Sequence, residues 1–555
     1  MCGIAGIIQP VGIAVDPSII INMEQAIRHR GPDDRGFLCW GQGNDKVFVS
    51  RNIKSIGQGS CWLAHRRLSI IDSSNNGWQP MLSNDGKLAI IFNGEIYNYI
   101  ELRHMLQDLG HHFQSSSDTE VLLIALKVWG VSVLEKLRGM FAFAMLDFEK
   151  GTILLARDHF GIKPLFYAHY RDGFVFSSEI KALLTLPDLS RQVNLSVVER
   201  YLNYGQSDGN EYTFFSKILQ IPPAHYIQTS FRKPTELSAN RYWMPGQLPP
   251  SQDTFDVAIE RTRKLFFDSM RMHLRSDVPI SATLSGGIDS SSIVCAMRNI
   301  CDPSLQINTF SFVASGEKFN EETWINKIAR NSVCSQHMLT LTPKIIMDSI
   351  EKVLMYQDEP VSSTSICAQF HLYKLIKQNG IKVALDGQGA DEYLAGYPTF
   401  IATMIAEYIK LGKLFNSINL FKRAHNSTNL SDFDVVMRVV SNLVPQSLSN
   451  KMRRVIFSGR EAGLILCADS VGLSMIKENR TNMAWQSALH QHLFISLTYS
   501  SLPQLLRYAD RNSMASSVES RLPFLSEDLV DYVLSLPANF ILNENGVSKN
   551  VFRKA

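Results

Sequence analysis

Residues 278–291 read Val-Pro-Ile-Ser-Ala-Thr-Leu-Ser-Gly-Gly-Ile-Asp-Ser-Ser, an apolar strand that leads through a glycine-rich turn into a helix. Strands and helices of this kind alternate onward to residue 386. Strands are expected at 278–284, 306–313, 337–341 and 381–386, and helices at 290–299, 321–331 and 343–355. This alternation predicts a mostly parallel sheet with right-handed crossovers. From about 398 to 536 the pattern predicts mainly helices.

The first 230 residues show a different pattern, in which short strands follow one another closely. Strands are expected at 2–8, 88–92, 139–148, 152–157, 165–170 and 173–177, and helices at about 18–28, 97–110 and 118–130. Turn residues such as Lys150-Gly151 separate neighbouring strands, as a meander requires. We therefore expect sheets with helices packed on them. Residues 231–254 are rich in proline and polar residues, which predicts a linker to the second half.

Length and composition limit the class of protein. A chain of 555 residues is long enough for two or three domains. Its 55 basic and 52 acidic residues give a formal net charge of +3, so composition gives no reason to expect nucleic acid or a membrane surface as a partner. No apolar run reaches the roughly 18–20 residues that span a bilayer, and we read no secretory signal. None of the eight cysteines forms a CxxC pair, which favours a cytoplasmic protein without a disulfide framework.

Cys2 would combine two reactive groups once the initiator methionine is removed. The residue would then carry a thiol and a free α-amine, and the amine could act as the general base for the thiol. Nearby glycines would let the backbone approach a ligand closely. The alternative is that Cys2 is a small buried residue at the start of a strand.

Three further segments carry groups that could bind a substrate next to a nucleophile at Cys2. Arg67 could grip an α-carboxylate with its guanidinium. Asn93 and Gly94, at an expected turn from strand to helix, could donate hydrogen bonds to a developing oxyanion. Asp118 opens a helix and could accept from an α-ammonium. The alternatives are a surface ion pair for Arg67, a hairpin turn for Asn93-Gly94, and an N-cap for Asp118 or Ser117.

Six motifs of the first half occur together in one order and spacing. They are MCGIAG (1–6), RHRGPDD (28–34), LAHRRLSI (63–70), FNGEIYN (92–98), SDTE (117–120) and RDHFGIKPLFY (157–167). Together they resemble the glutamine-hydrolysing domain of class II amidotransferases over nearly all of residues 2–230. The resemblance implies an N-terminal-nucleophile fold, a four-layer α-β-β-α sandwich. It also implies the following roles: Cys2 as the nucleophile, Asn93 and Gly94 as the oxyanion hole, and Arg67, Glu95 and Asp118 as ligands of the α-groups of glutamine.

The glycine-rich turn within residues 282–291 has the features of an anion-binding loop. Backbone N–H groups, hydroxyls and a helix N-terminus converge there, and the glycines allow close approach to phosphates. Asp289 would repel phosphate unless a cation such as Mg²⁺ lay between them. The loop lacks the lysine of the GxxxxGK[ST] pattern, so it is not a Walker A loop. The alternative is a glycine-rich turn capped by serine.

Further motifs extend through the second half. They are SGGIDSS (285–291), QDEP (357–360), SSTS (362–365), VALDGQGADE (383–392), LLRYADRNSM (505–514) and SVESRLPF (517–524). The first resembles the pyrophosphate-binding loop of ATP pyrophosphatases, and the whole combination resembles the glutamine-hydrolysing asparagine synthetases. The resemblance implies a Rossmann-like parallel-sheet ATP-pyrophosphatase domain over residues 255–555, with a helical C-terminal part. The expected fold class is thus a two-domain α/β protein.

The resemblance also implies substrates and residue roles for the second half. The pyrophosphate would be held by Ser285, Gly286, Gly287, Asp289 and Ser290, and Mg²⁺ by Asp289 and Asp391. The adenine and ribose site would include Leu284, Phe312 and Gly387, with Asp386 in the nucleotide site beside them. In the implied reaction, ATP activates the β-carboxylate of aspartate as an adenylate, and ammonia from glutamine converts it to asparagine, AMP and pyrophosphate. The expected partners are glutamine, aspartate (or another carboxylate) and ATP, and the oligomeric state is open, with a homodimer as one expectation.

Two features depart from the family pattern. Many members carry glutamate at the position of Gln388, and that glutamate is thought to accept a proton when ammonia attacks. A glutamine amide can orient a nucleophile but cannot take its proton, so the base is unassigned, with Glu392 and Asp358 as candidates. Family members also continue into an Arg-x-Lys-x-Gly-Phe-like segment. Lys549 and Lys554 come too early to correspond to its lysine, so we expect a C-terminally incomplete second domain.

Two other functions stay open on the sequence alone. One is a related amidotransferase or amide ligase that acts on another carboxylate, such as a peptide, a sugar acid or an antibiotic precursor. The other is a truncated, partly inactive relative with glutaminase activity only. No residue of the sequence distinguishes aspartate from another acid.

Overall fold

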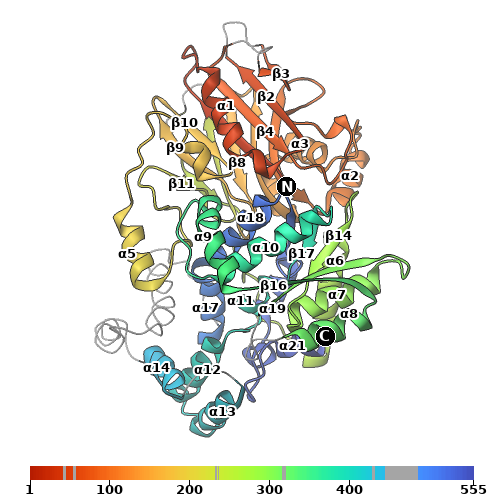
Figure 1. The fold of residues 1–555 in the computed structure, drawn as a ribbon, viewed down its shortest axis with the longest axis vertical. Coiled ribbons are helices and arrows are strands. Elements are labelled where there is room, and N and C mark those ends of the chain that lie inside the picture. Colours follow the sequence, from red (N-terminus) through yellow and green to blue (C-terminus); the bar gives the residue numbers. More distant parts are fainter. Residues whose placement is uncertain are drawn as a thin grey trace.

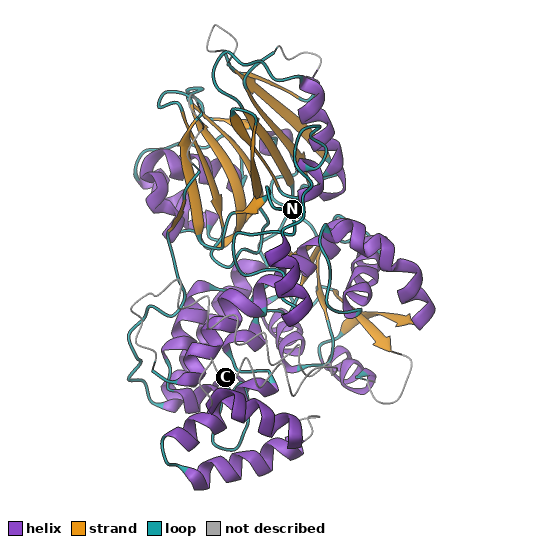
Figure 2. Cartoon of the chain, turned by 90° about the vertical axis from the view of Figure 1, so that its left-hand side faces the viewer, coloured by secondary structure: helices purple, strands orange, loops and turns teal. Residues whose placement is uncertain are grey.

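The computed structural model describes residues 1–41, 46–53, 58–231, 234, 237–314, 321–427, 432–443 and 486–555. These residues form a two-domain α/β fold, with two sheets in the first domain and a third in the second (Figure 1). The N-terminus lies where the two domains meet (Figures 1 and 2).

Two antiparallel sheets build the first domain. One has the strand order β11-β9-β10-β1-β4-β2-β3, and the other β13-β12-β8-β7-β6-β5. The strands are β1 (Gly3–Ile8), β2 (Asp34–Trp40), β3 (Phe48–Ser50), β4 (Cys61–Arg67), β5 (Met81–Leu82), β6 (Leu88–Ile96), β7 (Gly139–Asp147), β8 (Thr152–Arg157), β9 (Phe166–Tyr170), β10 (Gly173–Ser177), β11 (Leu219–Gln220), β12 (His225–Ser230) and β13 (Ala239–Arg241). The helices are α1 (Pro17–Ala26), α2 (Tyr99–Asp108), α3 (Asp118–Trp129), α4 (Ile180–Leu183) and α5 (Leu195–Tyr204).

The two sheets face each other and carry helices on their outer faces (Figure 2). Because side chains alternate along a strand, β1 directs Ile7 toward the α1 side and Ile8 into the layer between the sheets. Helices α2 and α3 cover the other sheet, where Leu122 packs with β6 and β7. The predicted four-layer α-β-β-α sandwich is confirmed.

A parallel sheet of order β16-β15-β14-β17-β18 organises the second domain, as the alternating pattern predicted. Its strands are β14 (Ile280–Thr283), β15 (Ile307–Ala314), β16 (Cys334–Leu341), β17 (Val383–Leu385) and β18 (Glu519–Arg521). The helices are α6 (Phe255–His273), α7 (Ile288–Ile300), α8 (Glu322–Asn331), α9 (Pro343–Gln357), α10 (Ser365–Gln378), α11 (Ala390–Tyr393), α12 (Pro398–Lys410), α13 (Leu414–Ser427), α14 (Asp432–Leu443), α17 (Ala488–Ile495), α18 (Leu502–Ala515), α19 (Glu527–Ser535), α20 (Ala538–Ile541) and α21 (Asn550–Lys554). No helix in the described part of the chain is both long and apolar enough to cross a membrane.

Strand β6 runs further than the sequence predicted. Asn93 and Gly94, expected to turn the chain, instead pair with β7, and the strand ends at Ile96. A Cβ at Gly94 would lie 2.0 Å from the carbonyl oxygen of Met140, so the absence of a side chain is what lets the strands pair here. The predicted turn is therefore wrong, because pairing within the sheet overrides the local turn preference of Asn-Gly.

Several strands lie where none was predicted, among them β2, β4 and β12 of the first domain and the short strands β13 and β18. Strand β13 lies inside segment 231–254 and pairs with β12, so the second sheet continues into the predicted linker. Strand β18 lies in the region predicted to be mainly helical and pairs in parallel with β17. Its three residues, Glu519 to Arg521, are polar yet buried. They show no apolar alternation, which is why the pattern did not reveal them.

Candidate active sites

Cys2 lies directly before β1 and is buried. Its N–H donates to Oδ1 of Asn93 at 2.9 Å, and its carbonyl accepts from Nε of Arg30 at 3.0 Å. Burial raises the pKa of the Cys2 thiol, and the nearby N-terminal ammonium, the Leu68 N–H and Arg67 oppose that rise. Nδ2 of Asn93 is buried without a hydrogen-bond partner among the described residues. The side chain of Asn93 therefore contacts Cys2 through its oxygen and keeps a free donor on its nitrogen, and an oxyanion hole requires such a donor.

Arg67 and Asp118 are held by backbone groups rather than by surface partners. Arg67 ends β4 and is buried, and its guanidinium donates to two carbonyls of the loop that follows. A surface ion pair is therefore the wrong interpretation of this residue. Asp118 opens α3, and its Oδ2 accepts from the Ile96 N–H at 3.0 Å. Ser117 is the N-cap, because its hydroxyl accepts from the Thr119 N–H.

Glu95 and Asp118 form a pair of buried carboxyl groups. Burial raises the pKa of Glu95 well above its usual range; Glu519 and Asp118 add to the rise, and Arg521 opposes it. Burial also raises the pKa of Asp118 to about 6. A positively charged ligand would stabilise the ionised form of such buried carboxyl groups. The structure thus brings together Cys2, Arg67, Asn93, Gly94, Glu95 and Asp118.

The second domain closes over this site. Oε2 of Glu519 lies 3.0 Å from the N-terminal ammonium of Met1, and Arg30 donates to both oxygens of Asp510 at 2.8 and 2.9 Å. Although burial alone would raise it, the ammonium and Arg521 hold the pKa of Glu519 at about 2. Glu519 and Asp510 belong to the motifs at 517–524 and 505–514, whose residues had no individual role assigned from the sequence. Arg30 and Asp510 are 480 positions apart in the chain, so no local pattern could pair them.

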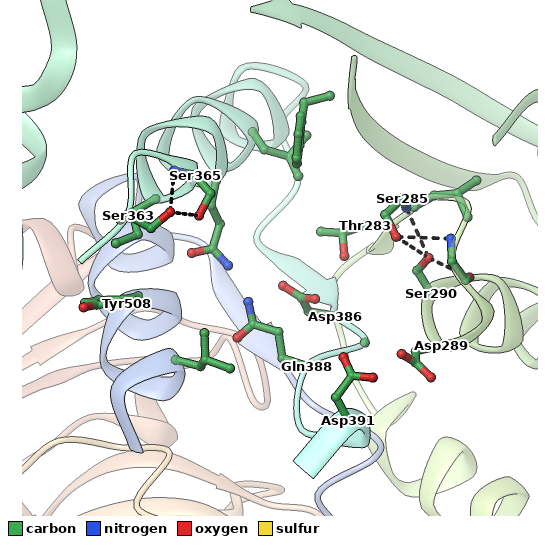
Figure 3. A pocket seen from close by; sticks show the side chains of 18 of the residues that line it. Thr283, Ser285, Asp289, Ser290, Ser363, Ser365, Asp386, Gln388, Asp391 and Tyr508 are labelled. Carbon is green, nitrogen blue, oxygen red and sulfur yellow. Dashed lines mark hydrogen bonds between the residues drawn. The ribbon is translucent and has the colours of Figure 1, made fainter. Parts of the chain in front are cut away.

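A second site is a cavity of about 450 Å³ at the carboxyl ends of the parallel strands (Figure 3). Its lining includes most of the predicted nucleotide residues: Leu284, Ser285, Gly287, Asp289, Ser290, Phe312, Asp386, Gly387 and Asp391. Gly286 is absent from the lining. It has a φ of +83° and faces α8, where a Cβ would lie 3.1 Å from the Cβ of Trp324.

The loop between β14 and α7 is closed by its own serines. The Ser285 N–H donates to Oγ of Ser290 at 3.1 Å, and the Gly287 N–H donates to Oγ of Ser285 at 3.3 Å (Figure 3). Helix α7 begins at Ile288, so Asp289 and Ser290 lie in its first turn. The capping residue is Gly287, which has no side chain to cap the helix. The first N–H groups of α7 thus remain available to an anion.

Lys549, which sequence spacing placed too early for a role at the phosphates, lies between two aspartates of this cavity. Its Nζ is 2.5 Å from Oδ2 of Asp289 and 2.5 Å from Oδ1 of Asp391. Burial raises the pKa of Asp289, and Lys549 opposes that rise. Oδ1 of Asp289 is buried without a hydrogen-bond partner among the described residues. Two carboxylates that converge on one cation are also what Mg²⁺ uses beside phosphates, so these residues fit that ion.

The candidates for the unassigned base lie in different places. Gln388 lines the cavity beside the aspartates, and its Oε1 is buried without a hydrogen-bond partner in the described part of the chain (Figure 3). Glu392 is fully buried and accepts from Oγ of Ser501, a cavity residue, at 2.9 Å. Burial raises the pKa of Glu392 to about 7. Asp358 instead binds Lys181 at the domain interface, so it is not placed to take a proton in the cavity.

The structure adds cavity residues to which the sequence assigned no role. Ser363, Ser365 and Tyr508 line the side opposite the aspartates (Figure 3). The serines belong to the SSTS motif and Tyr508 to the motif at 505–514. The two motifs marked these segments as similar to the family, but only the packing of α10 and α18 shows that the three residues line one cavity.

Comparisons with known proteins identify both halves of the chain. The family described as glutamine amidotransferase domain matches residues 1–243, and the family described as asparagine synthase matches residues 261–555. Glutamine-hydrolysing asparagine synthetase 1 of Bacillus subtilis is 29% identical over 100% of this chain and 84% of its own length. Putative glutamine-hydrolysing asparagine synthetase 2 of Methanocaldococcus jannaschii is 32% identical over 74% of this chain and 78% of its own. Amidase chry2 of Gibberella zeae is 25% identical over 99% of this chain and 84% of its own. The chain therefore belongs to the family of glutamine-hydrolysing asparagine synthetases.

Proposed function

We propose that this chain converts the β-carboxylate of aspartate into an amide, with ammonia from glutamine and with ATP as the activating substrate. Family membership supports glutamine-dependent amide ligation, and the relatives named asparagine synthetase support aspartate as the acid. One observation carries the proposal: two sites lie on the two sides of one domain interface. The first contains a buried cysteine next to a free amide donor, and the second is a cavity with an anion-binding loop.

The first domain would release ammonia. Once Met1 is removed, the α-amine of Cys2 would take the thiol proton, and the thiolate would attack the carboxamide carbon of glutamine. Nδ2 of Asn93 would donate to the oxyanion, and the protonated α-amine would give its proton to the amide nitrogen, which would leave as ammonia. Water would then release glutamate from the thioester and restore the thiol. Arg67 and Asp118 would hold the α-carboxylate and the α-ammonium of glutamine.

The second domain would activate the acid. A carboxylate oxygen of aspartate would attack the α-phosphorus of ATP, and the bond to pyrophosphate would break. Ser285, Ser290 and the first N–H groups of α7 would bind the departing pyrophosphate. Asp289 and Asp391 would hold Mg²⁺, which supplies positive charge to the phosphates.

Amide formation would follow in the same cavity. Ammonia would attack the acyl carbon, AMP would leave, and ammonia would lose one proton. Oε1 of Gln388 has a free acceptor position and could orient the ammonia, although it cannot take the proton. The interface between the sites is closed by buried ion pairs such as that of Arg30 with Asp510, which supports transfer of ammonia apart from solvent.

The test supplies glutamine, aspartate and ATP with Mg²⁺, and measures asparagine, glutamate and AMP. The proposal expects equal amounts of the three products. A parallel reaction with ammonium chloride in place of glutamine isolates the second domain. Glutamate release without AMP or asparagine in either reaction would contradict the synthetase half.

A second candidate is amide formation on a different acid. Lys549 is paired with Asp289 and Asp391, and no lysine or arginine is among the described residues that line the cavity. The polar lining opposite the loop consists of serines, glutamines and Tyr508. Such a lining offers hydrogen bonds, but no direct ion pair, to a second carboxylate of the acid. An acid panel that gives an amide with another acid but not with aspartate would support it.

A further inference from the structure

Arg521 lies on β18 and reaches from the second domain to the proposed glutamine site. The side chain is fully buried. Its Nε donates to Oε1 of Glu519 at 2.6 Å, and its Nη1 donates to the carbonyls of His273 and Arg275 at 2.7 and 2.6 Å. Nη2 has no hydrogen-bond partner in the described part of the chain and lies 3.8 Å from Oε1 of Glu95. Three hydrogen bonds thus fix the guanidinium, and Nη2, which carries the two remaining N–H groups, faces Glu95 of the first domain.

The groups around Nη2 are incompletely paired. Oε2 of Glu95 is also buried without a hydrogen-bond partner among the described residues. Buried polar groups are nearly always paired in folded proteins, so a free donor and a free acceptor at one buried place point to a ligand. The α-ammonium of glutamine could pair with the free Oε2 of Glu95, while Nη2 of Arg521 lies on the Oε1 side of the same carboxyl group.

The backbone of the same residue belongs to the other site. Arg521 pairs with Leu385 of β17, and its carbonyl accepts from the Asp386 N–H at 2.9 Å. Asp386 and Gly387 line the nucleotide cavity. One residue therefore contacts the glutamine side through its guanidinium and the nucleotide side through its carbonyl.

We propose that Arg521 is a positioning residue of the glutamine site, supplied by the second domain, which orients Glu95 for the α-groups of glutamine. The inference rests on the proposed role of Glu95 in binding glutamine. Arg521 acts through Glu95 and takes no part in bond making. Its backbone bond to Asp386 joins the position of Glu95 to the strand below the nucleotide cavity.

The test compares Arg521→Gln and Arg521→Lys with Arg138→Gln in the full chain. Arg138 is a matched control, because its side chain also forms a cross-domain ion pair, with Asp528 at 3.0 Å, but is partly exposed and donates to Asp528 and to the carbonyls of Glu135 and Leu137. Glutamate release is measured without ATP or acid. Arg521→Gln should raise KM for glutamine at least tenfold with kcat within threefold, and Arg521→Lys should give an intermediate KM. Arg138→Gln should leave both constants unchanged.

Other outcomes separate the inference from simpler explanations. Equal KM values for wild type, Arg521→Gln and Arg138→Gln would overturn it, as would a loss confined to kcat and thermal stability. If Arg521→Gln does not fold, Arg521→Lys decides: an unchanged KM overturns the inference. Binding of glutamine by calorimetry in a Cys2→Ala background should show the same tenfold loss for Arg521→Gln. A wild-type protein that releases no glutamate at all would instead contradict the proposed function.

Discussion

The glutamine site and the nucleotide cavity differ in how their charged groups are held. In the first domain, Glu95 and Asp118 are buried, and a backbone N–H together with residues of the second domain fix them. In the cavity, the side chain of Asp391 is 37% exposed, and one lysine holds both aspartates. The first site is therefore preorganised for a small substrate. The second depends on a cation that ATP and Mg²⁺ can rearrange.

Cys2→Ala should separate the two sites most completely. Glutamine-dependent amide formation should fall by roughly 10³-fold or more, because the nucleophile is lost. Amide formation from added ammonia should stay unchanged, since the cavity does not contain Cys2. Product analysis with each nitrogen source measures both rates. Cys295→Ala, at an exposed cysteine, is the control. Loss of both activities in Cys2→Ala alone would contradict the separation.

Asn93→Ala tests the preorganisation of the first site. Removing one oxyanion donor should lower kcat for glutamate release by about 10²- to 10³-fold. KM for glutamine should change little, because the donor acts on charge that develops only in the transition state. Steady-state glutaminase kinetics measure both constants. A rise in KM with kcat intact would show that Asn93 binds substrate instead of stabilising the oxyanion.

Lys549→Met tests the dependence of the cavity on its cation. Without the competing ammonium, Mn²⁺ as a substitute for Mg²⁺ should bind about tenfold more tightly in the absence of nucleotide. Electron paramagnetic resonance of free and bound Mn²⁺ measures this affinity without any turnover. Lys554→Met, at the end of the helix that follows Lys549, is the control and should match the wild type. An unchanged affinity in Lys549→Met would mean that the lysine does not occupy the metal position.

The pH dependence of glutamine binding should show the smallest effect. Since the pKa of Asp118 is raised to about 6, its carboxyl gains a proton as the pH falls through this value and loses its attraction for an α-ammonium. For one such group, KM for glutamine should rise about fourfold from pH 7.5 to 5.5. Asp118→Asn should have a high KM at both pH values. A wild-type KM that stays constant over this range would contradict the assignment.

The sequence predicted the layers of the fold and most residues of both sites. It did not predict the contacts between residues that are far apart in the chain. The motif around Asn93 was placed in the glutamine site, but sheet pairing through Gly94 replaced the expected turn. Motif spacing excludes Lys549 from a role at the phosphates, because spacing compares only positions along the chain. In the structure Lys549 contacts Asp289, which is 260 residues away in the sequence. Glu519 and Arg521 lie in a region predicted to be mainly helical and had no predicted role, although they form a buried ion pair on a strand. Hydrophobic periodicity along the chain predicts helices and strands, but ion pairs between distant residues produce no periodic pattern in the sequence.

The central claim, that the cavity activates a carboxylate with ATP, is tested most directly by exchange of labelled pyrophosphate into ATP. The exchange needs neither glutamine nor ammonia, so it reports on the second domain alone. The account predicts exchange that requires aspartate and Mg²⁺, persists in Cys2→Ala and is lost in Asp289→Asn. A protein that hydrolyses glutamine but shows no exchange with aspartate or any other acid of a panel would contradict it.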